Sequence, residues 1–178
     1  MGGLWGSFAN VCIYRIPQER GVVAGRSYCP QCKIKISWYD NIPILSYLFI
    51  QGKCRNCKKK ISIQYLVVEL ISIISFGVVY FFYGITFTTL WLIILALTFI
   101  IIFFIDLKHY IIPNSLTFPL MFLGFIKSFD PNLNELFPNY INSLIGGVFG
   151  YGIIWAIIFS YKVLRNKEGM GLGDAKLL

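Results

Sequence analysis

The chain has 178 residues, of which 57% are hydrophobic, 17% aromatic and only 13% charged, and the apolar residues lie in long blocks. This balance argues against an ordinary soluble domain. The net charge of +8 could suggest nucleic-acid binding, but ten of the sixteen Lys and Arg residues lie between positions 15 and 60. We therefore interpret the charge as a marker of membrane orientation and of contact with anionic lipid, with no nucleic-acid partner.

The first predicted element is an apolar segment at residues 1–14. It is too short to cross a bilayer, which needs about 20 residues, and it lacks the charged start of a signal peptide. We interpret it as the C-terminal part of a truncated first transmembrane helix. Gly2 and Gly6 have G-x-x-x-G spacing, which is a weak indication of contact with another helix.

Residues 15–63 are predicted to form a polar domain around a metal. Two C-x-x-C pairs, Cys29/Cys32 and Cys54/Cys57, stand 21 residues apart and suit one tetrahedral Zn²⁺ in a small zinc ribbon. Reduced, metal-loaded cysteines are typical of the cytosol, and short basic loops stay on the cytoplasmic side. Both arguments predict a cytoplasmic zinc-binding domain, irregular and with short strands.

Residues 64–178 are predicted to form a transmembrane core that is truncated at its C-terminal end. The expected spans are residues 64–83, 85–105, 111–129 and 141–161, each approaching the length needed for about 30 Å of hydrocarbon. The third is broken by prolines. The chain is expected on the cytoplasmic side at residue 105, and it must start the last span from the other side for the basic residues after 161 to be cytoplasmic, so an odd number of crossings is needed between these spans. The predicted fold class is thus an all-α polytopic membrane protein, a helical bundle with a small cytoplasmic zinc-ribbon-like loop domain.

Two aspartates are predicted at cytoplasmic helix ends. Asp106 ends the second span, and Asp174 lies in the sequence GLGD at residues 171–174, after the last span. A carboxylate pair is the minimum apparatus for aspartyl proteolysis: the ionised one takes a proton from water, and the protonated one donates a hydrogen bond to the scissile carbonyl. Most aspartates at helix ends are solvated or cap a neighbour, so for either residue the pattern alone favours that alternative.

Three further residues that carry reactive groups are better interpreted as structural than as catalytic. Glu69, near the start of its span, suggests a snorkelling side chain or an interhelical pair. His109, the one histidine, suggests a structural role at the membrane interface, and Cys12 suggests a packed free thiol.

Taken in order, these motifs resemble the type IV prepilin peptidases, membrane aspartyl proteases of the GxGD type that also N-methylate their product. Leu66 departs from the family, which often has proline after the residue corresponding to Tyr65. The matching segments are residues 6–17 for the N-terminal signature, 29–32, 40–47 and 52–57 for the zinc-binding segment, and 106–113 and 171–177 for the two catalytic motifs.

The resemblance implies a bacterial inner-membrane endopeptidase with Asp106 and Asp174 as its catalytic residues. It implies removal of a short basic leader from prepilins or pseudopilins after a Gly, at the cytoplasmic membrane boundary. It also implies methylation of the new N-terminus with S-adenosylmethionine, for which no Gly-rich nucleotide motif marks a site. Because this face is itself basic, recognition of a basic leader needs local acids, and Asp40, Glu69 and Glu168 are the candidates.

Two functions from other classes stay open. One is a membrane-anchored zinc-binding interaction protein, which would tolerate substitution of either Asp106 or Asp174. The other is a small proton-coupled transporter in which these residues relay protons, and it would lose flux without any protease phenotype. No sequence pattern indicates an oligomeric state.

Overall fold

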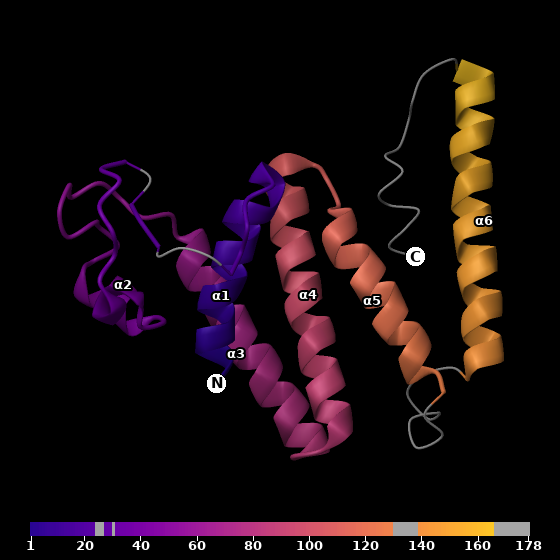
Figure 1. Cartoon of the computed structure of the whole chain (residues 1–178), viewed down its shortest axis with the longest axis horizontal. Coiled ribbons are helices and arrows are strands. Elements are labelled where there is room, and N and C mark those ends of the chain that lie inside the picture. The colour runs from indigo at the N-terminus through magenta and orange to yellow at the C-terminus, as the bar shows by residue number, and fades with distance from the viewer. Residues whose placement is uncertain (24–26, 30, 130–138, 166–178) are drawn as a thin grey trace. The chain divides into compact units, whose positions relative to one another are not determined.

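The computed structural model describes residues 1–23, 27–29, 31–129 and 139–165 (Figure 1). The chain divides into two compact units, Met1–His109 and Tyr110–Leu178. In the described ranges every regular element is a helix, which confirms the predicted all-α class. In chain order these are α1 (Gly2–Arg15), η1 (Ile16–Gln18), η2 (Trp38–Asn41), α2 (Leu45–Phe49), α3 (Gln64–Tyr83), α4 (Phe87–His109), α5 (Asn114–Lys127) and α6 (Tyr140–Arg165).

In the first unit, α1 packs against α3 through glycines. A Cβ atom added to Gly6 would lie 2.8 Å from Cα of Glu69, and one added to Gly2 would lie 2.9 Å from Cα of Ile73. Since neither distance leaves room for a side chain, the two glycines permit this close approach. The G-x-x-x-G spacing therefore marks a real helix contact.

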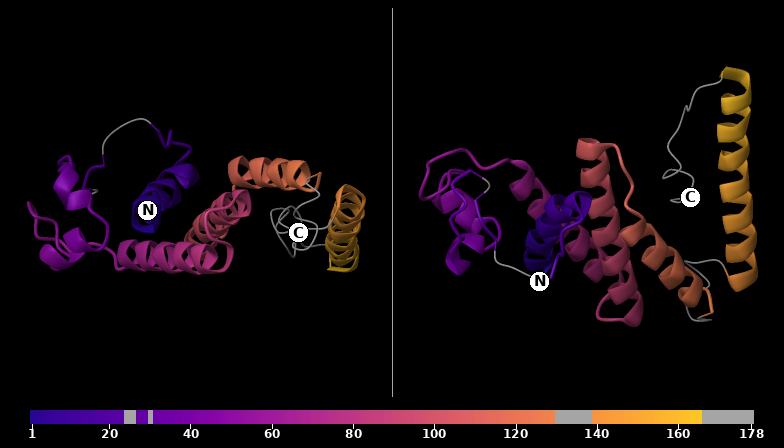
Figure 2. Two further views of the ribbon diagram at one scale, coloured as in Figure 1. Left: turned by 90° about the horizontal axis from the view of Figure 1, so that it is seen from below. Right: turned by 45° about the horizontal axis from the view of Figure 1, so that its top comes forward.

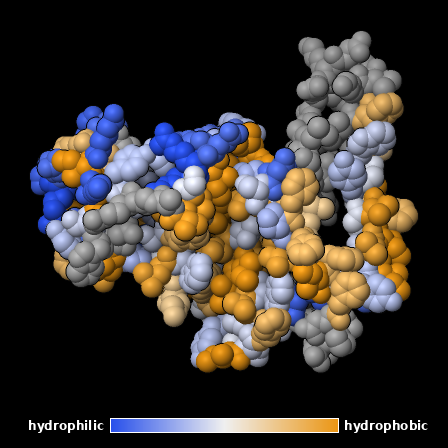
Figure 3. Space-filling view, in the orientation of Figure 1, coloured by the Kyte–Doolittle hydropathy of each residue, from blue (hydrophilic) through white to orange (hydrophobic). Residues whose placement is uncertain are grey.

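The core of this unit lies where α1, α3 and α4 meet (Figures 1 and 2). Asn10 on α1 donates a hydrogen bond from Nδ2 to the backbone oxygen of Tyr65, 3.1 Å away, which fixes α1 against the start of α3. Figure 3 shows hydrophobic residues over the visible face of the three helices and hydrophilic surface over the loop that follows α1. The buried apolar residues of these three helices are Ala9, Cys12, Ile13, Val68, Phe76, Ile100, Ile101, Ile102 and Ile105.

Among the residues that the structure describes, three helices are long and apolar enough to cross a membrane: α3, α4 and residues Tyr140–Ile157 of α6. The outer faces of α3 and α4 carry large exposed apolar side chains, such as Phe81 at 82% exposure and Phe103 at 57%. Such exposure is expected of a helix that crosses a membrane, because its outer face does not need to be covered by the rest of the protein.

The bounds of α3 match the predicted 64–83, but α4 runs past the predicted end at residue 105 to His109. At its start, Oγ1 of Thr86 accepts a hydrogen bond from the backbone N–H of Thr89, 3.2 Å away. At its end, Tyr110 has a left-handed backbone with φ 54°, and Pro113 follows. Nothing breaks the helix before that point, so Asp106 lies within the last turn of α4.

In the second unit, the segment predicted as a span at residues 111–129 contains α5, a helix of 14 residues with Pro119 inside it. A helix of that length covers about 21 Å, less than the hydrocarbon thickness. That this segment crosses the membrane stays a prediction. The segment predicted at 141–161 lies within α6, which has 26 residues.

Candidate metal centre and catalytic helix end

The four paired cysteines lie on two turns of the same design, residues 28–35 and 53–60. Each turn is closed by an isolated antiparallel bridge, and in the described part of this domain these two bridges take the place of the short strands that the sequence predicts. In each, the first cysteine donates its N–H to the carbonyl five residues later, and its own carbonyl accepts the N–H of a left-handed lysine four residues later. The bonds are Cys29 N to Ile34 O, 3.0 Å, Lys33 N to Cys29 O, 2.8 Å, Cys54 N to Lys59 O, 2.8 Å, and Lys58 N to Cys54 O, 2.9 Å.

These turns bring Cys29, Cys32, Cys54 and Cys57 together, as predicted. Their Sγ atoms all lie within 4.8 Å of one another, and those of Cys29 and Cys57 are 3.9 Å apart. A tetrahedral ion with metal–sulfur bonds of about 2.3 Å requires sulfurs about 3.8 Å apart. The cluster therefore has the geometry of a metal site, and four thiolates are the donor set of zinc or an iron–sulfur centre.

Backbone hydrogen bonds favour the thiolate that a metal needs. The N–H groups of Cys57 and Asn56 point at the sulfur of Cys54 and lower the pKa of its thiol to about 7. The N–H of Ile34 likewise lowers the pKa of Cys32. Each turn thus holds one sulfur with a lowered pKa, whereas the pKa of Cys57 is raised to about 11, because the N–H of Lys59, which lowers it, is outweighed by burial and the other three thiols.

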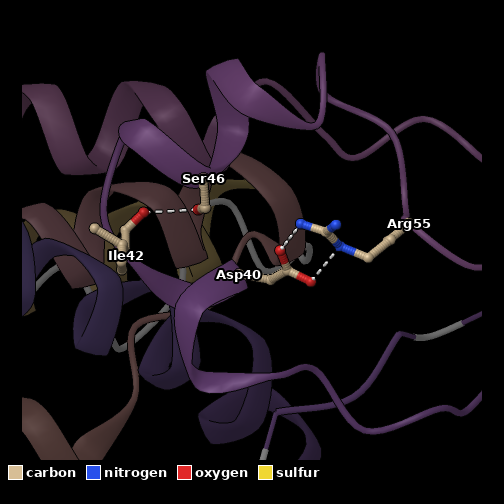
Figure 4. A network of polar contacts seen from close by, with 4 residues as sticks. All are labelled: Asp40, Ile42, Ser46 and Arg55. Carbon is tan, nitrogen blue, oxygen red and sulfur yellow. Dashed lines mark hydrogen bonds and ion pairs between the residues drawn. The ribbon is translucent and has the colours of Figure 1, made fainter.

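An ion pair ties the second turn to the segment between the cysteine pairs. Arg55 donates to both carboxylate oxygens of Asp40, at 2.7 and 3.0 Å (Figure 4). Its guanidinium also lies over the ring of Tyr39, 5.5 Å from the ring centroid. Ser46 donates from Oγ to the backbone oxygen of Ile42, 2.6 Å away. Because Arg55 makes two hydrogen bonds to the carboxylate of Asp40, this contact fixes the orientation of the two side chains as well as their distance.

Glu69 on α3 connects this loop domain to the helices. Its side chain is buried, and Oε2 accepts a hydrogen bond of 2.8 Å from the backbone N–H of Ile44. Ile44 has φ 62° and ψ −55°, and Leu45 N donates to Pro43 O, 2.6 Å away, closing a three-residue turn. A β-branched residue in that conformation costs on the order of 1–3 kcal/mol, which surrounding contacts must offset. The hydrogen bond of Glu69 thus joins a helix to a loop. It is neither the snorkelling side chain nor the interhelical pair that the sequence suggests.

Asp106 is exposed on the last turn of α4, directly after Ile105, which is fully buried. Among the residues that the structure describes, no hydrogen bond or ion pair engages its carboxylate. His109, three residues later, is also exposed. Asp174 lies outside the described residues, so the predicted pairing of the two aspartates stays a prediction.

The three acids considered for leader recognition differ in availability. Asp40 is paired with Arg55, and Glu69 is bonded to Ile44. Glu168 lies outside the described residues. Two of the three candidates therefore already have partners within the chain.

Sequence reasoning missed the strained turn at Ile44 and the short helix α2 after it. In the sequence, residues 40–47 stand out only as part of a family motif. The turn carries no local signal, because a left-handed conformation is expected at glycine or asparagine and not at isoleucine. The turn is instead held by the hydrogen bond from Ile44 N–H to Glu69, which lies 25 residues later in the chain.

Together these features define a multi-pass membrane protein with a four-cysteine metal site in a polar loop. Residues 1–83 match the bacterial peptidase A24 N-terminal domain, and residues 93–178 match the type IV leader peptidase family. The chain belongs to this leader peptidase family.

Several relatives share the name prepilin leader peptidase/N-methyltransferase. The chain is 38% identical to that of Neisseria gonorrhoeae, over its whole length and 69% of the relative's. It is 39% identical to that of Vibrio cholerae, over 97% of this chain and 70% of the relative. It is 34% identical to that of Pseudomonas aeruginosa, over its whole length and 68% of the relative. No solved structure matches the chain.

Proposed function

We propose that this chain removes the leader from type IV prepilins or pseudopilins and N-methylates the new N-terminus. The observation that carries the proposal is the agreement of both family matches, together spanning nearly the whole chain, with relatives that bear both activities in their name. The cut follows a Gly between a short basic leader and a hydrophobic helix. The enzyme sits in the bacterial inner membrane, where such a helix can lie beside it.

Asp106 and Asp174 are the catalytic pair in this proposal. The exposure of Asp106 on the last turn of an apolar helix supports its role, since a scissile bond at the membrane boundary must reach the carboxylate from outside the helices. One carboxylate, ionised, takes a proton from the attacking water. The other, protonated, donates a hydrogen bond to the scissile carbonyl, which two nearby carboxyls achieve by sharing one proton.

The metal of the four-cysteine cluster is zinc in this proposal, with a structural role. Four protein ligands close the coordination shell, which is the arrangement of structural zinc sites. Residues 15–63 form the zinc-binding domain, residues 64–178 the protease core, and residues 1–14 an accompanying helix. The zinc domain, Asp106 and Asp174 all lie on the cytoplasmic side, where thiols stay reduced.

Methylation uses S-adenosylmethionine, which supplies the methyl group to a neutral amine. The chain's task there is to orient the new N-terminus and to accept its proton. The basic loop domain also contacts anionic lipid headgroups, because each Lys or Arg near such a surface gains on the order of 1 kcal/mol.

The test is cleavage by the purified chain in lipid vesicles. A synthetic prepilin is added with and without S-adenosylmethionine, and its mass is followed. We expect loss of the leader in both reactions, and one added methyl group only with the donor. An intact substrate, with the chain folded and inserted, would contradict the proposal and favour the zinc-binding interaction protein or, if protons are carried, the transporter.

A further inference from the structure

The short helix α2 exposes an apolar face that nothing in the described chain covers. Leu45 is 54% exposed, Leu48 61% and Phe49 83%. Their spacing of three and four residues places them on one side of the helix. Tyr47, on the other side, is half-buried: its hydroxyl donates to the backbone oxygen of Ile61, 3.4 Å away. The helix therefore has a packed side and an outward apolar side.

The bond between Glu69 and Ile44 sets the height of α2 along α3. Ile44 directly precedes α2, and Glu69 lies five residues after the first residue of α3, Gln64. At 1.5 Å per residue, this contact lies about 7.5 Å along the membrane-crossing helix. Figure 1 shows α2 level with α1 and with the first part of α3. Interfacial helices bury their apolar faces about 5–10 Å into the boundary between headgroups and acyl chains.

Basic side chains stand beside this apolar face. Lys53 and Lys58 are exposed, and with Phe49 they line a shallow hollow of about 360 Å³. Arg55 also lines it but is paired with Asp40. An apolar residue next to two lysines complements the surface of an anionic bilayer, in which phosphates lie just above the acyl chains.

We propose that α2 is an interfacial anchor. Leu45, Leu48 and Phe49 insert into the leaflet in which α3 begins, and Lys53 and Lys58 bind its anionic headgroups. The proposal names the site of the lipid contact proposed above and does not depend on proteolysis. Because α3 and α4 are antiparallel and joined by a short turn, α2 and Asp106 lie toward the same side of the membrane. The anchor thus holds the metal-binding domain at a fixed height at the membrane boundary where Asp106 lies.

Depth-dependent fluorescence quenching tests the insertion. The variant F49W is compared with I34W, a matched control because Ile34 is an apolar residue of the same domain with 50% exposure. Each full-length variant is placed in phosphatidylglycerol vesicles, and the emission of the unchanged chain is subtracted. We expect the added emission of F49W to be shifted to the blue and mostly lost with acyl-brominated lipid. The proposal would be overturned if aqueous acrylamide quenches F49W and brominated lipid quenches F49W no more strongly than it quenches I34W.

A second arm tests the lysines. Lipid quenching of F49W should be stronger in phosphatidylglycerol than in phosphatidylcholine vesicles, and Lys53→Gln with Lys58→Gln should abolish that difference. Equal quenching in the two lipids before substitution would overturn the headgroup role. Leader cleavage, measured on the same vesicles, is a separate readout, so failure of the anchor and failure of the proposed activity are distinguishable.

Discussion

At the scale of single residues, Glu69 is the acid whose role the sequence obscured. The hydrogen bond to its buried carboxylate gives the backbone N–H of Ile44 a partner, and it also helps to offset the strain of holding this isoleucine at φ 62°. The acceptor therefore matters more than the charge. Glu69 differs in this from Asp106, whose exposed carboxylate accepts no such hydrogen bond from the described part of the chain.

Replacing Glu69 by alanine should release the turn at Ile44. Loss of the acceptor leaves the N–H unpaired, which costs on the order of 1–3 kcal/mol. Hydrogen exchange of residues 42–50 in vesicles should accelerate accordingly, while the control Glu69→Gln keeps an acceptor oxygen and most of the protection. Unchanged exchange in the alanine variant would show that the bond does not hold the turn.

Gly6 is predicted to tolerate no side chain. In Gly6→Ala the added carbon meets the backbone of α3, which cannot move aside as a flexible side chain would, so we expect destabilisation on the order of 1–3 kcal/mol. Gly77→Ala is the matched control, because nothing lies within 4 Å of an added Cβ there. Thermal unfolding in detergent should be lowered by the first substitution only. Equal midpoints for both variants would contradict the close packing of α1 on α3.

At the scale of elements, the sequence predicted what depends on local pattern. Uninterrupted apolar runs predicted α3 and α4, and the C-x-x-C spacing predicted the cluster, because both signals lie within short stretches of chain. The last turn of α4 lies beyond the predicted span because Asp106 ends the apolar run but does not end the helix. Only the left-handed Tyr110 ends it.

The loop domain was the least predictable element. Its strands reduce to two bridges, and α2 follows a turn that a residue on α3 holds in place. Such long-range causes leave no periodicity in the sequence. The site itself was predicted in part: the cysteines lie together, Asp106 lies at an exposed helix end, and the position of Asp174 stays a prediction.

The cysteine cluster should carry one zinc ion per chain, and its removal should unfold the loop domain alone. Among its described residues Cys29 is the one buried cysteine, and little apolar surface is buried, so ligation supplies much of the folding free energy of this domain. Chelation should open the many Lys and Arg sites of residues 27–60 to trypsin while the helix content of the spans persists. Metal below about half an equivalent, with all four thiols freely alkylated, would contradict the site.

At the scale of the whole molecule, proteolysis and methylation are predicted to separate. Methyl transfer to a free amine needs orientation and proton removal but no carboxylate pair. Asp106→Asn should therefore still methylate a substrate supplied already cut. Substitutions around the zinc-binding loop, which we expect to help hold the donor or the new N-terminus, should lower methylation more than cleavage. Parallel loss of both activities in the Asp106 variant, with its fold intact, would indicate one shared site.

The central claim is that Asp106 and Asp174 act as one catalytic unit. Its most direct test is cleavage of a synthetic prepilin by Asp106→Asn and Asp174→Asn, each compared with the unchanged chain in the same vesicles. Since neither remaining acid can fill both proton roles, each variant should lose proteolysis entirely while staying folded and inserted. Near-normal cleavage by either variant would contradict the assignment.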